Sequence, residues 1–322
     1  MEAEVDRNLA VNIFRYVVAT ITVVGNGFLL YLFYKFPKLR QSQYNLLVLL
    51  LNICDLLVGI GGLIRVSYAM YANANDIVLF DKNVCQRVNN VQGLGITGGK
   101  TVLVAIAFDR FMAVYKPIYY HKNKSRLFVY CIAGLSTFFS IVTTVSPIIG
   151  LGSSTKTTVC SMGAVSSKLL APLKLAYSGV FLFLMFTFYI LTIFLIIYRR
   201  KSTQIISFSE KNEIRIQMRM FVTVSFILLL CFVTYGIPTI LSLIGVVHDF
   251  GDAFRTYSSL YFGFGSLINA ALNVFLYLFK HNEIRRCFFL LFANVYPCMK
   301  KSIDSSTIFT IAVKSQFKLF KV

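Results

Sequence analysis

The sequence predicts an all-α membrane protein: a seven-transmembrane helix bundle with a short amphipathic eighth helix. The composition favours this class, because 57% of the 322 residues are hydrophobic and only 14% are charged, whereas soluble domains carry about 25% charged residues. Long apolar runs alternate with short basic loops. The runs are continuous rather than alternating in polarity, which favours helices over the strands of a barrel.

Seven apolar runs are each long enough to cross a bilayer as a helix. They cover residues 11–35, 44–70, 86–115, 126–149, 171–198, 217–246 and 255–279. The segment after the seventh run carries basic and aromatic residues, which is typical of a helix lying on the membrane surface. We therefore expect an N-terminal segment at 1–10, a helical domain at 11–292 and a tail at 293–322.

Basic residues indicate the orientation of the bundle. They concentrate in the loops that follow spans one, three and five, and in the C-terminal tail. By the positive-inside rule these segments lie in the cytoplasm and the N-terminus lies outside. No basic region precedes the first apolar run, so we expect no removable signal peptide.

The net charge of +19 does not indicate nucleic-acid binding. The basic residues lie between apolar spans rather than on one polar face, and they suit contact with anionic membrane lipids. The three histidines lie near loops or the surface, and no second acid accompanies Asp55. We therefore expect no enzyme activity, no metal ion and no cofactor.

Two of the seven cysteines are candidates for a disulfide bond. Cys85 and Cys160 lie at the outer ends of spans, where they would pair if that side is extracellular. Arg110 follows Cys85 by 25 residues, which is about 37 Å along a helix. One helix therefore places these two residues at opposite membrane faces.

Polar residues inside the first two spans need buried partners. Asn26 lies between two glycines in span one, and Asp55 lies at membrane depth in span two. A carboxylate at that depth is costly and usually functional; the alternative is a protonated structural acid. Arg65 lies ten residues farther out, and it either reaches the outer surface or lines a cavity.

The third span contains a lysine and ends in an acid–base pair. Lys100 lies mid-span, where a lysine must pair, lose its proton or reach water. Asp55 is one candidate partner, and an outward-reaching lysine is the alternative. Asp109 and Arg110 close the span at its inner end, followed by Phe111.

Spans five and six each carry a residue of interest, a tyrosine in the first and a proline in the second. Tyr189 lies deep in span five, and Pro238 is expected to kink span six because it lacks a backbone donor. Phe232 precedes that proline by six residues. It would either act as a pivot for the kink or simply pack in the core.

Span seven places three polar residues on one helix face. Asn269, Asn273 and Tyr277 are each four residues apart, so their side chains lie above one another. Two amides and a phenol inside a membrane need polar partners, and Asp55 is the expected one.

Six features, in order and correctly spaced, resemble those of rhodopsin-like (class A) G-protein-coupled receptors. The resemblance covers roughly residues 11–292. It rests on Gly25-Asn26, the run from Leu51 to Asp55, the interval from Cys85 to Arg110, Asp109-Arg110-Phe111, Pro117, and the run from Asn273 to Tyr277.

The sequence departs from the family pattern at several positions. Phe111 stands where the family has tyrosine, and Val274 stands where it has proline. Gly236 occupies the position of the usual span-six tryptophan, and Phe181 lies near that of the usual span-five proline.

The resemblance implies a switch that is activated by a ligand. Asp109 would hold Arg110 at rest, and a ligand in the outer half would bias the Pro238 kink so that a heterotrimeric G protein is admitted. The implied coupling and switch residues are Asp109, Arg110, Phe111, Tyr189, Phe232, Pro238, Asn273 and Tyr277. The implied buried polar network comprises Asn26, Asp55, Lys100 and Asn269.

The resemblance constrains the ligand mainly by exclusion. Gln92 stands where aminergic receptors carry an aspartate, so a biogenic amine is disfavoured. Leu267 stands where opsins carry a lysine, which disfavours retinal. A cationic outer cavity would favour an anionic or carboxylate-bearing small molecule or a short peptide. The expected ligand contacts are Arg65, Gln92, Lys174, Tyr235 and Tyr261, with Lys100 adding charge.

Within the class, the tryptophan-free, phenylalanine-rich sequence and the segment 109–117 are most similar to nematode chemoreceptors of the Srsx type. This implies a plasma-membrane receptor for a chemosensory cue, located in sensory cilia. One alternative is a neuropeptide receptor of the same fold. Another is a membrane transporter with an ion path through Asp55, Lys100 and Asn273, although no internal repeat or pair of broken helices supports it.

Overall fold

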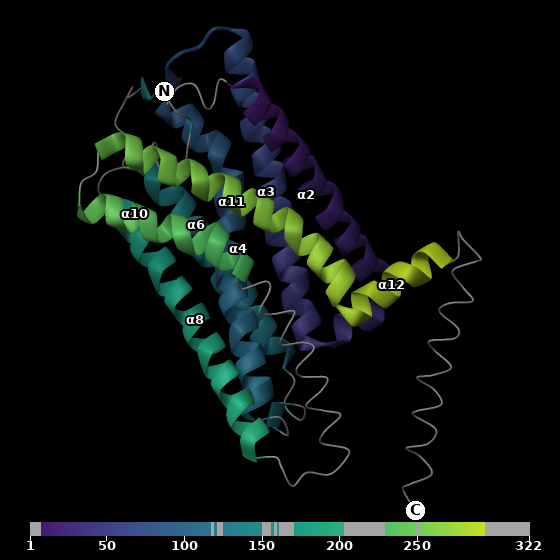
Figure 1. Ribbon diagram of the computed structural model, residues 1–322. Helices are drawn as coiled ribbons and strands as arrows, with labels where there is room; N and C mark the ends of the chain where they lie inside the picture. Colours follow the sequence, from purple (N-terminus) through teal and green to yellow (C-terminus); the bar gives the residue numbers. More distant parts are fainter. Residues whose placement is uncertain are drawn as a thin grey trace, which may run out of the picture.

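The computed structural model describes residues 8–116, 119–120, 125–149, 156–157, 160, 171–202, 229–248 and 251–293. These residues form a helix bundle (Figure 1). Its long helices are α2 (Leu9–Lys35), α3 (Gln43–Ala74), α4 (Lys82–Tyr115), α6 (Arg126–Ile149), α8 (Ala171–Ser202) and α11 (Gly251–Lys280). Shorter helices are α10 (Ile237–Val247) and α12 (Asn282–Ala293), with a 3-10 turn, η1 (Pro37–Gln41), and a π-helical segment, η2 (Phe232–Gly236).

Six helices in the described part of the chain are long and apolar enough to cross a membrane. They match six of the seven predicted spans, with ends that differ by a few residues. The sixth predicted span, 217–246, is described from residue 229 onward, where the apolar helix Leu229–Gly245 lies. The predicted all-helical, seven-span architecture is therefore confirmed.

Helix α4 lies at the centre of the bundle and packs against α3, α6 and α8. Glycine permits its close approach to α3. A Cβ atom on Gly95 would lie 2.5 Å from the Cys54 carbonyl oxygen and 2.7 Å from the Val58 nitrogen. Any side chain at this position would push the two helices apart, so the mid-span glycines bring α3 and α4 into backbone contact.

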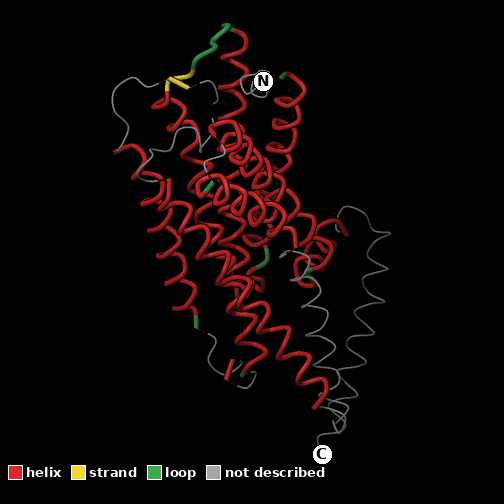
Figure 2. The backbone as a smooth tube through the Cα atoms, turned by 60° about the vertical axis from the view of Figure 1, so that its left-hand side comes forward, coloured by secondary structure: helices red, strands yellow, loops and turns green. Residues whose placement is uncertain are grey.

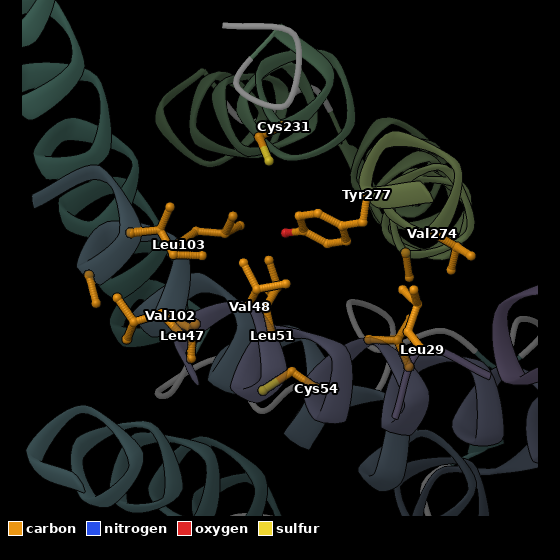
Figure 3. Close-up of a cluster of buried hydrophobic side chains, with 14 of the residues drawn as sticks. Leu29, Leu47, Val48, Leu51, Cys54, Val102, Leu103, Cys231, Val274 and Tyr277 are labelled. Atoms are coloured by element: carbon orange, nitrogen blue, oxygen red, sulfur yellow. The ribbon is translucent and has the colours of Figure 1, made fainter. Parts of the chain in front are cut away.

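The hydrophobic core of the bundle includes the phenol ring of Tyr277. Figure 3 shows Tyr277 of α11 pointing inward, toward Cys231 above and Val48 and Leu51 below. Tyr277 is 1% exposed, and Leu51 and Cys231 are equally enclosed. The phenol of span seven therefore lies in the core.

The proline in span six produces a π-helical segment. The N–H of Ile237 bonds to the carbonyl of Phe232, five residues back, and Pro238 then opens α10. Pro238 has no N–H to continue this pattern toward the carbonyl of Val233. Such segments are rare and mostly occur as single turns inside α-helices, and this one lies where the sequence predicted an interruption.

One end of the bundle is closed by a disulfide bond and a pair of short strands. Cys85, in the first turn of α4, is bonded to Cys160, as predicted. Beside it, β1 (Phe80–Asp81) pairs antiparallel with β2 (Lys156–Thr157), and Figure 2 shows these strands at one tip of the bundle. We call this the disulfide end.

The opposite end, which we call the Arg110 end, carries α12. This helix turns away from the line of α11 after His281 (Figure 1). Its position is held by the Asn45 amide, which donates to the Glu283 carboxylate at 2.6 Å, and by Ile284, which is completely buried. The predicted eighth helix is thus present and is fixed to α3.

Candidate functional site

A buried ion pair marks the Arg110 end. The Arg110 guanidinium donates to Asp109 Oδ2 from Nη2 at 2.7 Å and from Nε at 3.2 Å. The Asp109 side chain is completely buried and that of Arg110 is 14% exposed. The contact expected from the sequence is therefore present.

Asp109 has two further donors that the sequence did not predict. Gln43 Nε2, at the start of α3, donates to Oδ1 at 2.8 Å. The Tyr120 hydroxyl donates to both carboxylate oxygens at 2.9 and 3.0 Å. Burial and the neighbouring carboxylate raise the pKa of Tyr120 above its usual value, so this phenol remains a donor. Three elements thus hold one carboxylate, and charge-assisted bonds of this kind are the strong ones.

Arg110 also rests on an aromatic stack. Its Cζ atom lies 3.8 Å from the centroid of the Tyr44 ring. The His281 ring also contacts that ring, stacked at 5.5 Å with an interplanar angle of 10°. Tyr44 therefore links the arginine of α4 to the junction between α11 and α12. No spacing rule relates these residues, because they meet only through the packing of three helices.

The aromatic residues that the sequence predicts near the Asp109–Arg110 pair pack against neighbouring side chains. Phe111 stacks on Tyr115 at 5.5 Å and meets Phe188 of α8 at 5.9 Å. Tyr189 is partly buried against the core. Phe232 packs edge-on against Phe186 at 5.4 Å, so it joins η2 to α8.

A polar layer crosses the middle of the bundle. The Asn273 amide donates to Asp55 Oδ2 at 2.9 Å, which is the predicted pairing between spans two and seven. Asn26 donates to the carbonyls of Thr22 at 2.9 Å and Ala270 at 3.3 Å. These contacts tie α2, α3 and α11 together.

The remaining residues of span seven show how the departures from the family pattern are accommodated. Asn269 does not bond to Asp55; its Oδ1 lies 3.8 Å from the Cys231 sulfur instead. Val274, in place of the family proline, packs tightly on Gly25, where an added Cβ would lie 2.9 Å from Cγ1. At Gly236 an added Cβ would lie 2.7 Å from the Phe232 ring, so that ring occupies the space beside the missing tryptophan.

The suggested pairing of Lys100 with Asp55 is wrong. The Lys100 ammonium donates to Ser178 Oγ of α8 at 2.7 Å and lies 4.6 Å from the Phe262 ring centroid. Asp55 bonds to Asn273 instead. The reason is helical geometry: Lys100 faces α8, whereas Asp55 faces α11. Lys100 is therefore not a member of the predicted network.

The expected ligand contacts of spans two and three lie together toward the disulfide end. Arg65 is only 7% exposed, so it does not reach the surface. Its Nη1 would lie 3.1 Å from a Cβ on Gly263 of α11. The Gln92 amide donates to the Gly263 carbonyl at 3.4 Å and approaches Ser266 Oγ at 3.5 Å. Both side chains therefore converge on one turn of α11.

Another arginine that the sequence analysis missed flanks this turn. Arg15 of α2 is 5% exposed, and its Cζ atom lies 4.3 Å from the ring centroid of Phe264. A basic residue inside an apolar span, six residues after the start of α2, is the signal that would have found it.

The other expected ligand contacts differ in their surroundings. Tyr235 is 7% exposed and packs on Phe262 at 5.7 Å. The Tyr261 hydroxyl donates to the Val233 carbonyl at 2.8 Å, so it supports η2. Lys174 belongs to α8, but its side chain lies outside the described residues.

Two curated receptors are similar to part of the chain. A tyramine receptor, Ser-2, of Caenorhabditis elegans is 29% identical over 134 residues, which is 42% of this chain and 29% of that protein. Octopamine receptor 2 of Lymnaea stagnalis is 32% identical over 133 residues, which is 40% of this chain and 22% of that protein. The chain thus matches less than a third of the length of either relative.

The family assignment rests on a longer match. The family model of the 7 transmembrane receptor (rhodopsin family) matches residues 25–277. That range begins at the Gly25-Asn26 pair and ends at Tyr277, and it includes the Asp109–Arg110 pair and the Asp55–Asn273 bond. The chain therefore belongs to the rhodopsin family of seven-transmembrane receptors, and it is a receptor rather than an enzyme.

Proposed function

We propose that this receptor binds a small molecule from outside the cell and activates a heterotrimeric G protein at its Arg110 end. The observation that carries the proposal is the buried Asp109–Arg110 pair, held by Gln43 and Tyr120. A charge pair enclosed in this way is stable only while its partners remain in place. Movement of the helices would free Arg110 for an acidic or carbonyl-rich partner surface.

The π-helical segment supplies an element that can transmit the signal. It lies between the Cys231 level of the core and α10, and it packs on α8 through Phe232. Irregular segments of this kind are frequent at functional sites. A ligand that favours one arrangement of η2 would shift the population of receptors with an open Arg110 end.

Coupling is tested by G-protein activation in cells that express the chain. Arg110→Ala is compared with Arg40→Ala, which removes an exposed arginine at the same end. We expect activation to be lost in the first variant and kept in the second at equal surface expression. Activation that survives Arg110→Ala would contradict the proposed coupling residue.

The charge of the bundle interior supports an anionic ligand rather than an amine. The relatives are named as receptors for tyramine and octopamine, and an amine needs an anionic partner. In this chain Gln92 faces Gly263 and Ser266, and the described cations nearby are Arg15 and Arg65. A carboxylate-bearing small molecule or short peptide complements these groups.

The ligand class is tested by a panel that contains tyramine, octopamine and small carboxylates. We expect the amines to be inactive and some carboxylates to activate. Arg65→Ala and Lys174→Ala should then weaken the response. Unchanged potency in both variants would reject an anion-binding site formed by these residues. A response to tyramine would show instead that the receptor binds an amine, as its relatives are named to do.

The biological setting that fits best is chemosensation at the plasma membrane, with the N-terminus outside and the C-terminus inside. The support is the resemblance of residues 109–117 to Srsx-type chemoreceptors. A neuropeptide receptor of the same fold remains the alternative. Immunolabelling of an N-terminal tag in intact cells tests the orientation, and labelling only after permeabilisation would reverse it.

A further inference from the structure

A cavity surrounds Lys100 between α4, α8 and the η2–α10 region. Nine residues line it: Lys100, Leu103, Ser178, Phe181, Leu182, Met185, Cys231, Tyr235 and Thr239. The centre of a water molecule has about 20 Å³ in which to move, and the empty space is about 320 Å³ when the open part is included. The enclosed part therefore holds about one water molecule, so the body of a small-molecule ligand would also occupy the open part.

The charge of Lys100 is not balanced by an anion in the described part of the structure. An ammonium group has three N–H donors. Its hydrogen-bond partner is the neutral Ser178 hydroxyl, and the rings of Phe262 and Tyr235 lie 4.6 and 5.8 Å away. Aromatic faces attract a cation, but they do not supply the negative charge that a cation inside a membrane protein usually pairs with.

The rest of the cavity has the character of a site for an acid with an apolar body. The residues at its wall include Ser178, Tyr235 and Thr239, which carry hydroxyls, and the Ser178 hydroxyl contacts the cation. The other walls are aliphatic, aromatic or sulfur-bearing. Sites of this kind bind the body of a ligand through apolar contact and orient it through a few polar groups.

This cavity is separate from the Gln92 region described above. Lys100 follows Gln92 by eight residues, which places it about 12 Å deeper along α4. Its wall includes Cys231 and Tyr235, which stand just before and within η2. A molecule bound here touches the segment that connects the two ends of the receptor.

We propose that the Lys100 cavity is a binding site for a small organic carboxylate, whose acid group pairs with the Lys100 ammonium and the Ser178 hydroxyl. Its apolar body lies along Phe181, Leu182 and Met185 of α8. The signalling consequence rests on the proposed receptor function, because it requires that η2 move. The binding itself does not rest on that function.

The site is tested by thermal unfolding of the purified receptor with hexanoate and benzoate, each compared with its neutral amide. We expect the carboxylates, but not hexanamide or benzamide, to raise the melting temperature, since a ligand that binds only the folded state stabilises it. Lys100→Met should abolish this shift, and Lys100→Arg should keep part of it. Lys116→Met, which removes an exposed lysine directly after α4, should leave the shift intact.

Three results would overturn the proposal. They are equal shifts from acids and amides, no shift from any probe, and a shift of the same size in Lys100→Met as in the parent receptor. If Lys100→Met does not fold, Met185→Phe provides the second variant, because it fills the apolar wall without removing the charge and should also abolish the shift. Melting requires neither agonist nor G protein, so failure here and failure of the coupling assay are distinguishable.

Discussion

The ring of Tyr44 contacts both the guanidinium of Arg110, 3.8 Å from its centroid, and the imidazole of His281, stacked at 5.5 Å. This arrangement joins α3, α4 and the start of α12 at the Arg110 end. Arg110 is therefore restrained on two sides, by the Asp109 carboxylate and by an aromatic face. A receptor that opens at this end must break both contacts.

Replacement of Tyr44 by leucine should raise basal G-protein activation. The change removes the aromatic face, and a cation–π contact contributes about 0.5–2 kcal/mol. The population with a released Arg110 should therefore increase by roughly 2- to 30-fold. Basal activation at equal surface expression is the measurement. Tyr34→Leu is the control, because Tyr34 is 78% exposed, and an equal rise in both variants would reject the contact as the cause.

Replacement of Tyr120 by phenylalanine should also raise basal G-protein activation. It removes the hydroxyl that donates to both Asp109 oxygens, and a hydrogen bond to a charged group contributes about 1.5–3 kcal/mol. Tyr119→Phe is the matched control, because the side chain of Tyr119, next in the chain, is 57% exposed. We expect higher basal activation in Tyr120→Phe alone. Identical activity in the two variants would show that this hydroxyl does not stabilise the resting pair.

Replacement of Asn273 by leucine should lower the thermal stability of the receptor. The change leaves the buried Asp55 carboxyl without its amide donor, and loss of one partner costs about 1–3 kcal/mol. Asp55→Asn combined with Asn273→Leu should be less than additive, because the two residues contact each other. Additive losses in a double-mutant cycle would mean that the bond contributes nothing of its own.

Replacement of Tyr261 by phenylalanine should destabilise the π-helical segment. The Tyr261 hydroxyl donates to the carbonyl of Val233 at 2.8 Å, the acceptor that Pro238 is unable to serve. We expect a loss of about 1 kcal/mol in unfolding free energy. Hydrogen exchange at η2 should also accelerate. Tyr257→Phe, on the same helix and 42% exposed, is the control, and unchanged exchange at η2 would exclude this role for the hydroxyl.

His281 should make stability depend on pH. Burial lowers its pKa from the usual 6.5 to about 4, and the Ile284 N–H donates to Nδ1, which requires that atom to be unprotonated. Because the folded-state pKa is lower, the unfolded state binds more protons between about pH 4 and 6.5. Stability is then full above pH 6.5 and falls as the pH decreases, by about 2 kcal/mol at pH 5.

Replacement of His281 by phenylalanine provides the comparison for this effect. Phenylalanine keeps the stack on Tyr44 but does not titrate. The difference between the melting temperatures at pH 7 and pH 5 should therefore be smaller in His281→Phe than in the parent receptor. An equal difference in the two proteins would assign the pH dependence to other groups.

The sequence by itself determined the membrane class, the spans and the contacts that follow from periodicity or local spacing. Apolar runs define spans because the bilayer has a fixed thickness. Asp109 and Arg110 are adjacent in the chain, and Asn273 lies on a helix face whose polar groups require a partner, so both pairs were predicted. Cys85 and Cys160 were predicted because their span ends share one side of the membrane.

Only the tertiary structure decided the contacts that depend on how the helices are rotated against one another. Lys100 and Asp55 lie at similar depth, which made their pairing reasonable, but the first faces Ser178 of α8 and the second faces Asn273 of α11. Tyr44, Arg110 and His281 likewise share no spacing. The depth of a residue in the membrane follows from its position in the sequence. The direction of its side chain depends on how whole helices pack, and the sequence of one span does not contain that information.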